Sequence, residues 1–272
     1  MSTFSTLQLD ISPTGIATLW LNRPEKNNAF NAAMINELLQ ALDAVKERKD
    51  LRFMLLRGHG KHFSAGADLE WMRAAAKLDY NANLQDAREL AEVMASLYQL
   101  PIPTLAVVQG AAYGGALGLI SCCDLAIGAS DSQFCLSEVR IGLTPAVISP
   151  FVVKAMGERQ ARRYALTAEA FSGEKAVTLG LLHASYAPEQ LDSAVNDWCR
   201  TLLDNSPAAM RATKSLLQEV KHGELTPALR RYTEAAIARI RVSPEGQEGL
   251  NAFLDKRPPH WRVAANPSSR EQ

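Results

Sequence analysis

Apolar positions near the N-terminus alternate with polar ones in two short runs. Residues 7–11 and 16–21 each repeat with a period of two, and Pro13-Thr14-Gly15 lies between them. This pattern predicts a β-hairpin. After Asn31 the period becomes helical, with Asn31 as the predicted N-cap and one apolar face made by Met34, Ile35, Leu38, Leu39, Leu42 and Val45.

The middle of the chain combines uniformly apolar runs with amphipathic ones. Apolar runs without alternation are typical of strands buried on both faces. We predict strands over 53–56, 104–109, 125–127 and 133–136, and helices over 70–77, 84–98 and 114–122. No G-x-G-x-x-G follows the first strand, so we expect an α/β core of repeated strand–strand–helix units rather than a dinucleotide-binding sheet.

The strand pattern stops near residue 188. Four helices are predicted beyond it, over 189–203, 207–221, 226–241 and 244–255. Their apolar stripes are too long to be buried by such small helices alone, so we expect them to cover the core or a neighbouring subunit. The chain is therefore predicted to have a core with the active site over 1–195 and a helical oligomerisation region over 196–272, with a disordered tail after Trp261.

Composition excludes several classes of function. The 272 residues carry 29 Lys and Arg against 29 Asp and Glu, so a general nucleic-acid role has no electrostatic support. The N-terminus lacks a signal-peptide pattern, and no apolar run approaches a membrane span, so we expect a cytoplasmic protein without a membrane partner. The four cysteines form no C-x-x-C pair and the five histidines no ligand spacing, so no metal site is expected.

Two glycine-rich segments follow apolar strands. They are Ser64-Ala65-Gly66-Ala67-Asp68-Leu69 and the run from Gly110 to Gly118. Backbone with almost no side chain can point its N–H groups at an anion, and Asp68 is a candidate cap of the helix that follows. Each segment also has a plainer interpretation, an ordinary strand-to-helix turn for the first and tight helix packing for the second.

Glu138 is the candidate acid–base group. It follows a predicted strand and stands among apolar residues in the segment from Cys135 to Gly142. A desolvated carboxyl there would have a raised pKa and would suit proton transfer. The alternative is a salt bridge to Arg140 or to another cation.

These segments occur in the order found in the enoyl-CoA hydratase/isomerase (crotonase) superfamily, which this chain resembles over about residues 5–261. The matching motifs include Leu21-Asn22-Arg23-Pro24, Phe63 to Leu69, Gln109 to Asp124, Phe134 to Pro145 and Glu245 to Arg257. The segments 116–129 and 134–153 look most like bacterial methylglutaconyl-CoA hydratases of leucine breakdown. The resemblance implies a crotonase-like spiral of ββα units with a C-terminal helical trimerisation region, assembled as a homotrimer or as a homohexamer made of two trimers.

The resemblance also implies the site residues. The oxyanion-hole N–H groups belong to Ala67 and Gly115, and Glu138 matches a catalytic glutamate. The substrate is an acyl-CoA, so CoA is part of the substrate and no separate cofactor is expected. The positions that match CoA-binding segments are Arg23, Lys26, Asn28, Ala29, Ala65, Asp68, Leu69, Phe253 and Lys256.

Two departures from the family pattern stand out. Typical hydratases place two glutamates around one water, but Gly118 occupies the position of the first, so either Glu138 performs both proton transfers or Tyr113, Ser137 or a water supplies the missing role. The segment 144–150 is usually glycine-rich in the family and here reads Thr-Pro-Ala-Val-Ile-Ser-Pro. We expect this loop to be bulkier and to reshape the acyl pocket.

The leading hypothesis is hydration of an α,β-unsaturated acyl-CoA, 3-methylglutaconyl-CoA above others, with Glu138 as the single acid–base group. Arg140, Arg73 and Lys77 are candidate partners of the substrate carboxylate, and each is also compatible with an ordinary surface charge. One alternative is a Δ3,Δ2-enoyl-CoA isomerase, which needs only one base. The other is a non-catalytic CoA-ester or RNA-binding member of the fold.

Overall fold

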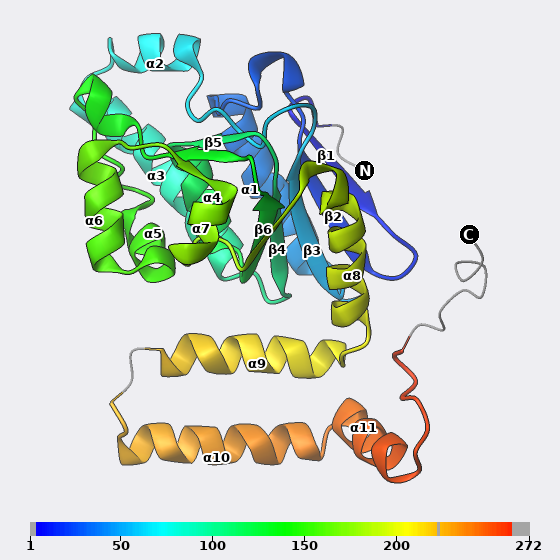
Figure 1. Cartoon of the computed structure of the whole chain (residues 1–272). Coiled ribbons are helices and arrows are strands. Elements are labelled where there is room, and N and C mark those ends of the chain that lie inside the picture. The colour runs from blue at the N-terminus through cyan, green and yellow to red at the C-terminus, as the bar shows by residue number, and fades with distance from the viewer. Residues whose placement is uncertain (1–3, 222–223, 263–272) are drawn as a thin grey trace. The chain divides into compact units, whose positions relative to one another are not determined.

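The computed structural model describes residues 4–221 and 224–262 (Figure 1). The described chain forms two units. The first runs to Leu100 and from Thr104 to Val195, and the second contains Pro101–Pro103 and the residues from Asn196 onward. The tail predicted to be disordered begins at Arg262, and its remaining residues lie outside the described ones.

A six-stranded sheet forms the centre of the first unit (Figure 1). Its strand order is β1-β2-β3-β4-β6-β9; β1 is antiparallel to β2, and the other neighbours are parallel. The strands are β1 (Leu7–Ile11), β2 (Ile16–Leu21), β3 (Phe53–Gly58), β4 (Thr104–Val108), β6 (Leu125–Ala129) and β9 (Ala184–Tyr186). The predicted hairpin is β1 and β2, and the predicted buried strands are β3, β4 and β6.

A second sheet of three short strands lies in the same unit. It consists of β5 (Ala111–Tyr113), β7 (Gln133–Cys135) and β8 (Phe171–Ser172), with β5 parallel to β7. An isolated bridge from Ser64 to Ala112 ties the first glycine-rich segment to this sheet. Both glycine-rich segments are therefore fixed at the same sheet edge.

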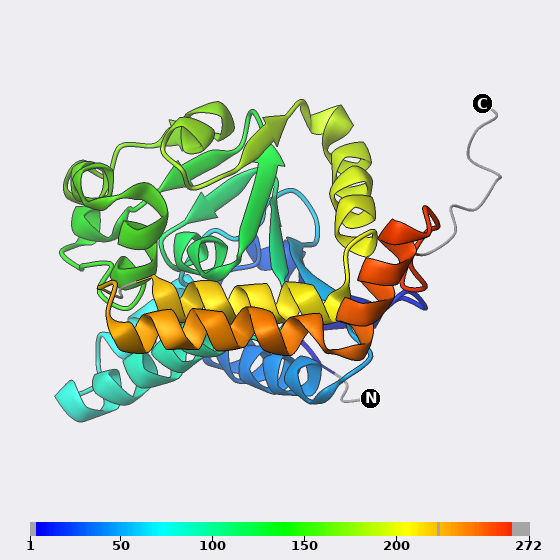
Figure 2. The ribbon, with the colours of Figure 1, turned by 90° about the horizontal axis from the view of Figure 1, so that it is seen from below.

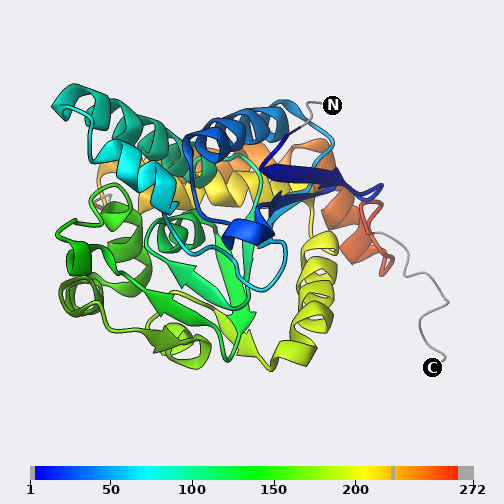
Figure 3. The ribbon, with the colours of Figure 1, turned by 90° about the horizontal axis from the view of Figure 1, so that it is seen from above.

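The long helices of the first unit bury one face each. Helix α1 (Ala32–Glu47) begins where the Asn31 side chain accepts the N–H of Met34 at 2.9 Å, as predicted. Helix α3 (Tyr80–Tyr98) runs beside α1 (Figure 3). It starts four residues before the predicted residue 84, because the Asp79 side chain caps a first turn that has no apolar stripe.

The remaining helices of this unit are short. They are α2 (Leu69–Ala75), α4 (Gly115–Cys122), α5 (Ser149–Met156), α6 (Glu158–Thr167) and α7 (Gly173–Thr178), with 3-10 turns η1 (Pro24–Lys26), η2 (Glu138–Ile141) and η3 (Pro188–Gln190). Helices α2 and α4 are close to their predicted bounds. Each begins inside a glycine-rich segment, and the amides at its start have no intrahelical partners.

The second unit is helical. Helix α8 (Leu191–Leu203) crosses the boundary, and α9 (Pro207–Val220), α10 (Pro227–Arg241) and α11 (Pro244–Leu254) follow. Helices α9 and α10 lie side by side (Figure 2). All four bounds are close to those predicted from the sequence. Within the described residues, no helix is both long enough and apolar enough to cross a bilayer.

Candidate active site

The first glycine-rich segment is held by hydrogen bonds to strand β5. Ser64 donates its N–H to the Ala111 carbonyl at 3.1 Å, and Tyr113 donates to the Ser64 carbonyl at 3.0 Å. Gly66 has a φ of +88°, and a Cβ there would lie 2.9 Å from the Tyr113 carbonyl oxygen. Only glycine fits this position without strain. The backbone at Ala67 is thereby brought against the second segment.

The second segment turns sharply at Gly114. This residue has a φ of +53° and donates its N–H to the Cys135 carbonyl at 2.9 Å, which ties the turn to strand β7. Gly115 then begins α4, and a Cβ at Gly115 would lie 3.0 Å from the Phe30 ring. A Cβ at Gly66 would lie 3.9 Å from the Gly114 nitrogen, so the residues that precede Ala67 and Gly115 are neighbours.

The amide groups of Ala67 and Gly115 are unpaired. Neither N–H has an acceptor in the part of the chain that the structure describes. Gly115 is half-buried and Ala67 is exposed, so both can be approached from outside. Two unpaired N–H groups on adjacent, rigidly held turns can both donate to one anionic oxygen.

Glu138 lies against the same turn. It is the first residue of η2, and its Oε1 would be 3.2 Å from a Cβ at Gly114. Its Oε2 is buried and has no hydrogen-bond partner among the described residues. Burial raises the pKa of the Glu138 carboxyl, an effect that a hydrogen bond from its own backbone only partly offsets.

The expected alternative, a salt bridge from Glu138 to Arg140, is absent from the described chain. The Arg140 guanidinium instead donates to the Ala168 carbonyl at 2.6 Å, at the end of α6. Glu138 therefore keeps a desolvated carboxyl beside the turn at Gly114, which is the environment of an acid–base group.

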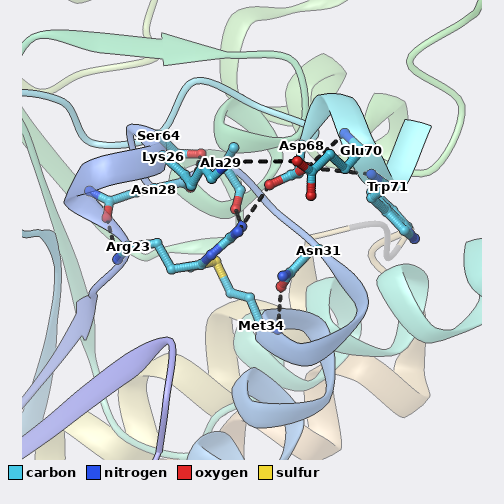
Figure 4. Close-up of polar contacts among 10 residues, drawn as sticks. All are labelled: Arg23, Lys26, Asn28, Ala29, Asn31, Met34, Ser64, Asp68, Glu70 and Trp71. Atoms are coloured by element: carbon cyan, nitrogen blue, oxygen red, sulfur yellow. Dashed lines mark hydrogen bonds and ion pairs between the residues drawn. The ribbon is translucent and has the colours of Figure 1, made fainter. Parts of the chain in front are cut away.

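Asp68 is the other carboxyl at the site, and its partners are all accounted for (Figure 4). It accepts the N–H groups of Glu70 at 2.8 Å and Trp71 at 3.3 Å, and the Arg23 guanidinium at 3.0 Å. Burial alone would raise the pKa of Asp68, but these donors outweigh it and hold the pKa below its usual value. The prediction that Asp68 caps α2 is confirmed.

Arg23 and Asn28 hold the neighbouring turn together. Arg23 also donates to the Ala29 carbonyl at 2.6 Å, and its backbone N–H donates to the Asn28 side chain at 2.8 Å. Asn28 is fully buried, and its amide nitrogen donates to the carbonyls of His59 and His62, each at 2.8 Å. The Arg23 and Asn28 side chains therefore fix the conformation of this turn by hydrogen bonding to backbone groups.

The other predicted CoA-binding positions differ in exposure. Ala29 is buried, Ala65 is half-buried, Leu69 is exposed, and the Lys26 ammonium lies 3.8 Å from Glu70. In the second unit, Phe253 near the end of α11 is 81% exposed, and Lys256 follows with a φ of +54°. Arg73 and Lys77, the remaining candidates for a substrate carboxylate, are exposed on and just after α2.

The space that a side chain at position 118 would occupy is filled by two residues that the sequence did not point to. A Cβ there would lie 2.8 Å from the Cβ of Ile148, closer still to its Cγ2, and 3.1 Å from the Cε of Met94. The expected bulk of segment 144–150 is the signal that could have identified Ile148. No cluster of three or more His, Cys, Asp or Glu that could hold a metal ion occurs among the described residues.

Known proteins match the chain over almost its whole length. The enoyl-CoA hydratase/isomerase family model matches residues 12–264. A crystal structure of an enoyl-CoA hydratase from Shewanella pealeana has 49% sequence identity and a TM-score of 0.90, covering 95% of this chain and 96% of that one.

Two further relatives have activities in their names. A hydroxycinnamoyl-CoA hydratase-lyase of Pseudomonas fluorescens is 31% identical, over 94% of this chain and 95% of its own length. A crotonyl-CoA hydratase of Syntrophomonas wolfei is 29% identical, over 89% of this chain and 92% of its own.

The fold is thus the crotonase fold, a mixed α/β unit followed by a helical region. The chain belongs to the enoyl-CoA hydratase/isomerase family. At the level of the class, it is a hydratase-type enzyme that acts on an enoyl-CoA thioester.

Proposed function

We propose that this chain hydrates 3-methylglutaconyl-CoA, a step of leucine breakdown, and that Glu138 is its single acid–base group. The observation that carries the proposal is the buried, unpaired carboxyl oxygen of Glu138 beside the turn that presents Gly115. The exact acyl group rests on the resemblance of segments 116–129 and 134–153 to methylglutaconyl-CoA hydratases.

In the proposed reaction, water adds across the carbon–carbon double bond. Glu138 takes a proton from the water as its oxygen bonds to the β-carbon, and it then delivers a proton to the α-carbon. The π electrons move toward the thioester oxygen, and the N–H groups of Ala67 and Gly115 donate hydrogen bonds to it as its negative charge grows. Donors placed in this way contribute about 2.7–4 kcal/mol each. A carboxyl of raised pKa suits both proton transfers.

CoA and the acyl carboxylate need their own partners in this proposal. The Lys26 ammonium is 48% exposed and is available to the nucleotide end of CoA, while Arg23, Asn28 and Asp68 hold the backbone around it. Phe253 and Lys256 are proposed to reach a CoA within a trimer or hexamer. Of the candidates for the acyl carboxylate, we favour Arg73 and Lys77, which are exposed, over Arg140, whose guanidinium already donates to the Ala168 carbonyl.

The test replaces Glu138 by Gln, which keeps the shape and removes the base. We expect hydration, followed as loss of the conjugated thioester absorbance, to fall by about 10²–10⁴-fold. Binding of the CoA ester should survive. Glu158→Gln is the matched control, because Glu158 is exposed on α6 and should leave the rate unchanged. Full activity of the Glu138→Gln protein would contradict the proposal.

A second candidate activity is Δ3,Δ2-enoyl-CoA isomerisation. It is favoured by one observation: the position of a second acid is Gly118, and Ile148 fills the adjoining space. Turnover in ¹⁸O-labelled water separates the two reactions, since hydration places solvent oxygen on the β-carbon and isomerisation does not. Binding of CoA esters without turnover of any enoyl-CoA would instead favour a non-catalytic binding protein.

A further inference from the structure

The two amide-bearing turns are joined by a short parallel ladder between strand β5 and the segment that precedes Ala67. The Ser64 N–H donates to the Ala111 carbonyl at 3.1 Å, and the Ser64 carbonyl accepts the N–H of Tyr113 at 3.0 Å. The bonds of a parallel ladder are evenly spaced and repeat every second residue. One step earlier, the Ala111 N–H would therefore donate to the carbonyl of His62.

The His62 side chain takes the place of that carbonyl. Its ring Nδ1 accepts the Ala111 N–H at 2.9 Å. The His62 carbonyl instead accepts the Asn28 side-chain amide at 2.8 Å. The next N–H along the chain, that of Phe63, donates to the Gln109 carbonyl at 2.8 Å. The ladder is therefore out of step by one residue here, and an imidazole nitrogen closes it where a main-chain oxygen ordinarily would.

Gly110 makes room for this contact. Its φ is +60°, and a Cβ there would lie 2.6 Å from the His62 Nδ1 and closer still to the Lys61 carbonyl oxygen. Any side chain at this position would push the ring away from the Ala111 N–H. The first glycine of the second glycine-rich segment therefore serves the histidine contact, whereas Gly115, five residues later, presents a free amide.

Only the neutral ring can accept the Ala111 N–H. With Nδ1 as the acceptor, the proton of the neutral ring is on Nε2. Protonation places a hydrogen on Nδ1 as well, so two donors would face each other and the bond would be lost. Burial and, to a smaller extent, the Lys61 ammonium lower the pKa of the His62 ring. The contacts that His62 makes with other segments, at Gly110, Ala111 and Asn28, are with uncharged groups.

This hydrogen bond is close in the chain to both proposed oxyanion donors. Ala67 lies five residues after His62, and Gly115 lies four residues after Ala111. Between the bond and those two amides, the segments are held together by the main-chain hydrogen bonds of Ser64. Loss of the His62 bond would free the start of β5 and allow one turn to shift relative to the other. A displacement of about 1 Å in such a site can cost about 10²-fold in rate.

We propose that His62 is a positioning residue for the oxyanion hole: its neutral ring, by accepting the Ala111 N–H, holds the two amide-bearing turns in register. The inference rests on the proposed function and adds a condition to it. The ring acts through β5 and needs no contact with the substrate. Because a protonated ring cannot accept the bond, the rate should fall in acid for a reason separate from the titration of Glu138.

The experiment compares His62→Asn with His62→Ala. The Asn Oδ1 can take the position of the ring Nδ1 and accepts an N–H at every pH, whereas Ala removes the acceptor. At pH 8, kcat for the enoyl-CoA substrate should fall by about 10- to 100-fold in His62→Ala and by less than about threefold in His62→Asn, while KM changes little in both. A kcat of His62→Ala within twofold of the wild type, or equal losses in the two variants, would overturn the proposal.

The pH dependence separates positioning from packing, and it can be measured even if His62→Ala does not fold. Glu138 is present in both the wild type and His62→Asn, so the ratio of their kcat values cancels its titration. That ratio should be constant near neutral pH and should rise in favour of His62→Asn as the pH falls through the pKa of His62, which lies below the ordinary value of 6.5. A side chain that only fills space gives a ratio independent of pH, and that result would overturn the proposal.

His59→Asn is the matched control. The His59 carbonyl also accepts the Asn28 side-chain amide, at 2.8 Å. The His59 ring, however, stacks on Trp20 and pairs with the Gln8 side chain at 3.0 Å. The same substitution there should leave kcat and its pH dependence as in the wild type. A rise of the ratio in His59→Asn equal to that in His62→Asn would overturn the assignment to His62.

A measurement without turnover separates this inference from the proposed function. The NMR shifts of the Ala111 amide should follow the titration of the His62 ring in the wild type and should stay constant over the same pH range in His62→Asn. Ala111 shifts that do not follow the ring would overturn the inference even in a protein that hydrates enoyl esters. The expected shifts together with no hydration would contradict the proposed function and support the His62 contact.

Discussion

Two largely buried carboxyl groups stand beside the two amide-bearing turns, and their surroundings are opposite. Asp68 follows Ala67 and accepts two backbone N–H groups and the Arg23 guanidinium. Glu138 lies against Gly114, and its Oε2 has no partner among the described residues. The pKa of Asp68 is lowered and that of Glu138 is raised. Burial alone does not make a carboxyl reactive; the supply of donors around it decides.

The largest expected difference between the two carboxyls is their effect on kcat. Neutralising Glu138 is expected to remove most of kcat, whereas Asp68→Asn should change kcat by less than about threefold, since Asn still accepts the N–H groups at the start of α2. Steady-state hydration rates at saturating CoA ester check both variants under one set of conditions. A loss of kcat in Asp68→Asn as large as that in Glu138→Gln would mean that the two carboxyls act as one catalytic pair.

The surroundings of these two carboxyl groups could be predicted from the sequence only in part. Asp68 precedes an amphipathic segment, so its role as a helix cap was readable locally. Its pairing with Arg23 was not, because 45 residues separate the two. Glu138 was predicted from its apolar neighbours, but the alternative of a salt bridge to Arg140 could be discarded only when Ala168 proved to accept the guanidinium.

The fold was predicted best where local signals are strong. Helices α9, α10 and α11 each begin with a Ser or Thr whose side chain accepts a backbone N–H, followed by Pro. Strands β5, β8 and β9 have at most three residues, too few to establish a period. The closure of Gly118 by Ile148 depends on packing between residues distant in sequence, which no local pattern contains.

The same comparison predicts a difference in stability. Asp68→Asn leaves the Arg23 guanidinium, whose side chain is 13% exposed, without a charged partner, and should lower the free energy of unfolding by about 2 kcal/mol. Asp79→Asn is the control: Asp79 caps α3 in the same way but is exposed, so its replacement should cost less than about 0.5 kcal/mol. Denaturant unfolding at neutral pH measures both. Equal losses would show that the ion pair adds nothing to the cap.

The smallest expected effect is in the pH dependence of stability. The raised pKa of Glu138 means that the folded state holds its proton more tightly than the unfolded one, so this contribution is full below the ordinary value of 4.5 and is lost as the pH rises through the folded pKa. Glu138→Gln has no carboxyl to lose a proton, so its stability relative to the wild type should grow from pH 4 toward neutrality.

For Asp68 the sign of the pH dependence is opposite. Its stabilisation is present above the ordinary pKa of 3.8 and is lost as the pH falls through the lower folded pKa. The stability of Asp68→Asn should therefore approach that of the wild type in acid. Unfolding free energies of the three proteins between pH 3 and 8 measure both trends, and curves that run parallel across that range would mean that neither carboxyl differs in pKa between the folded and unfolded states.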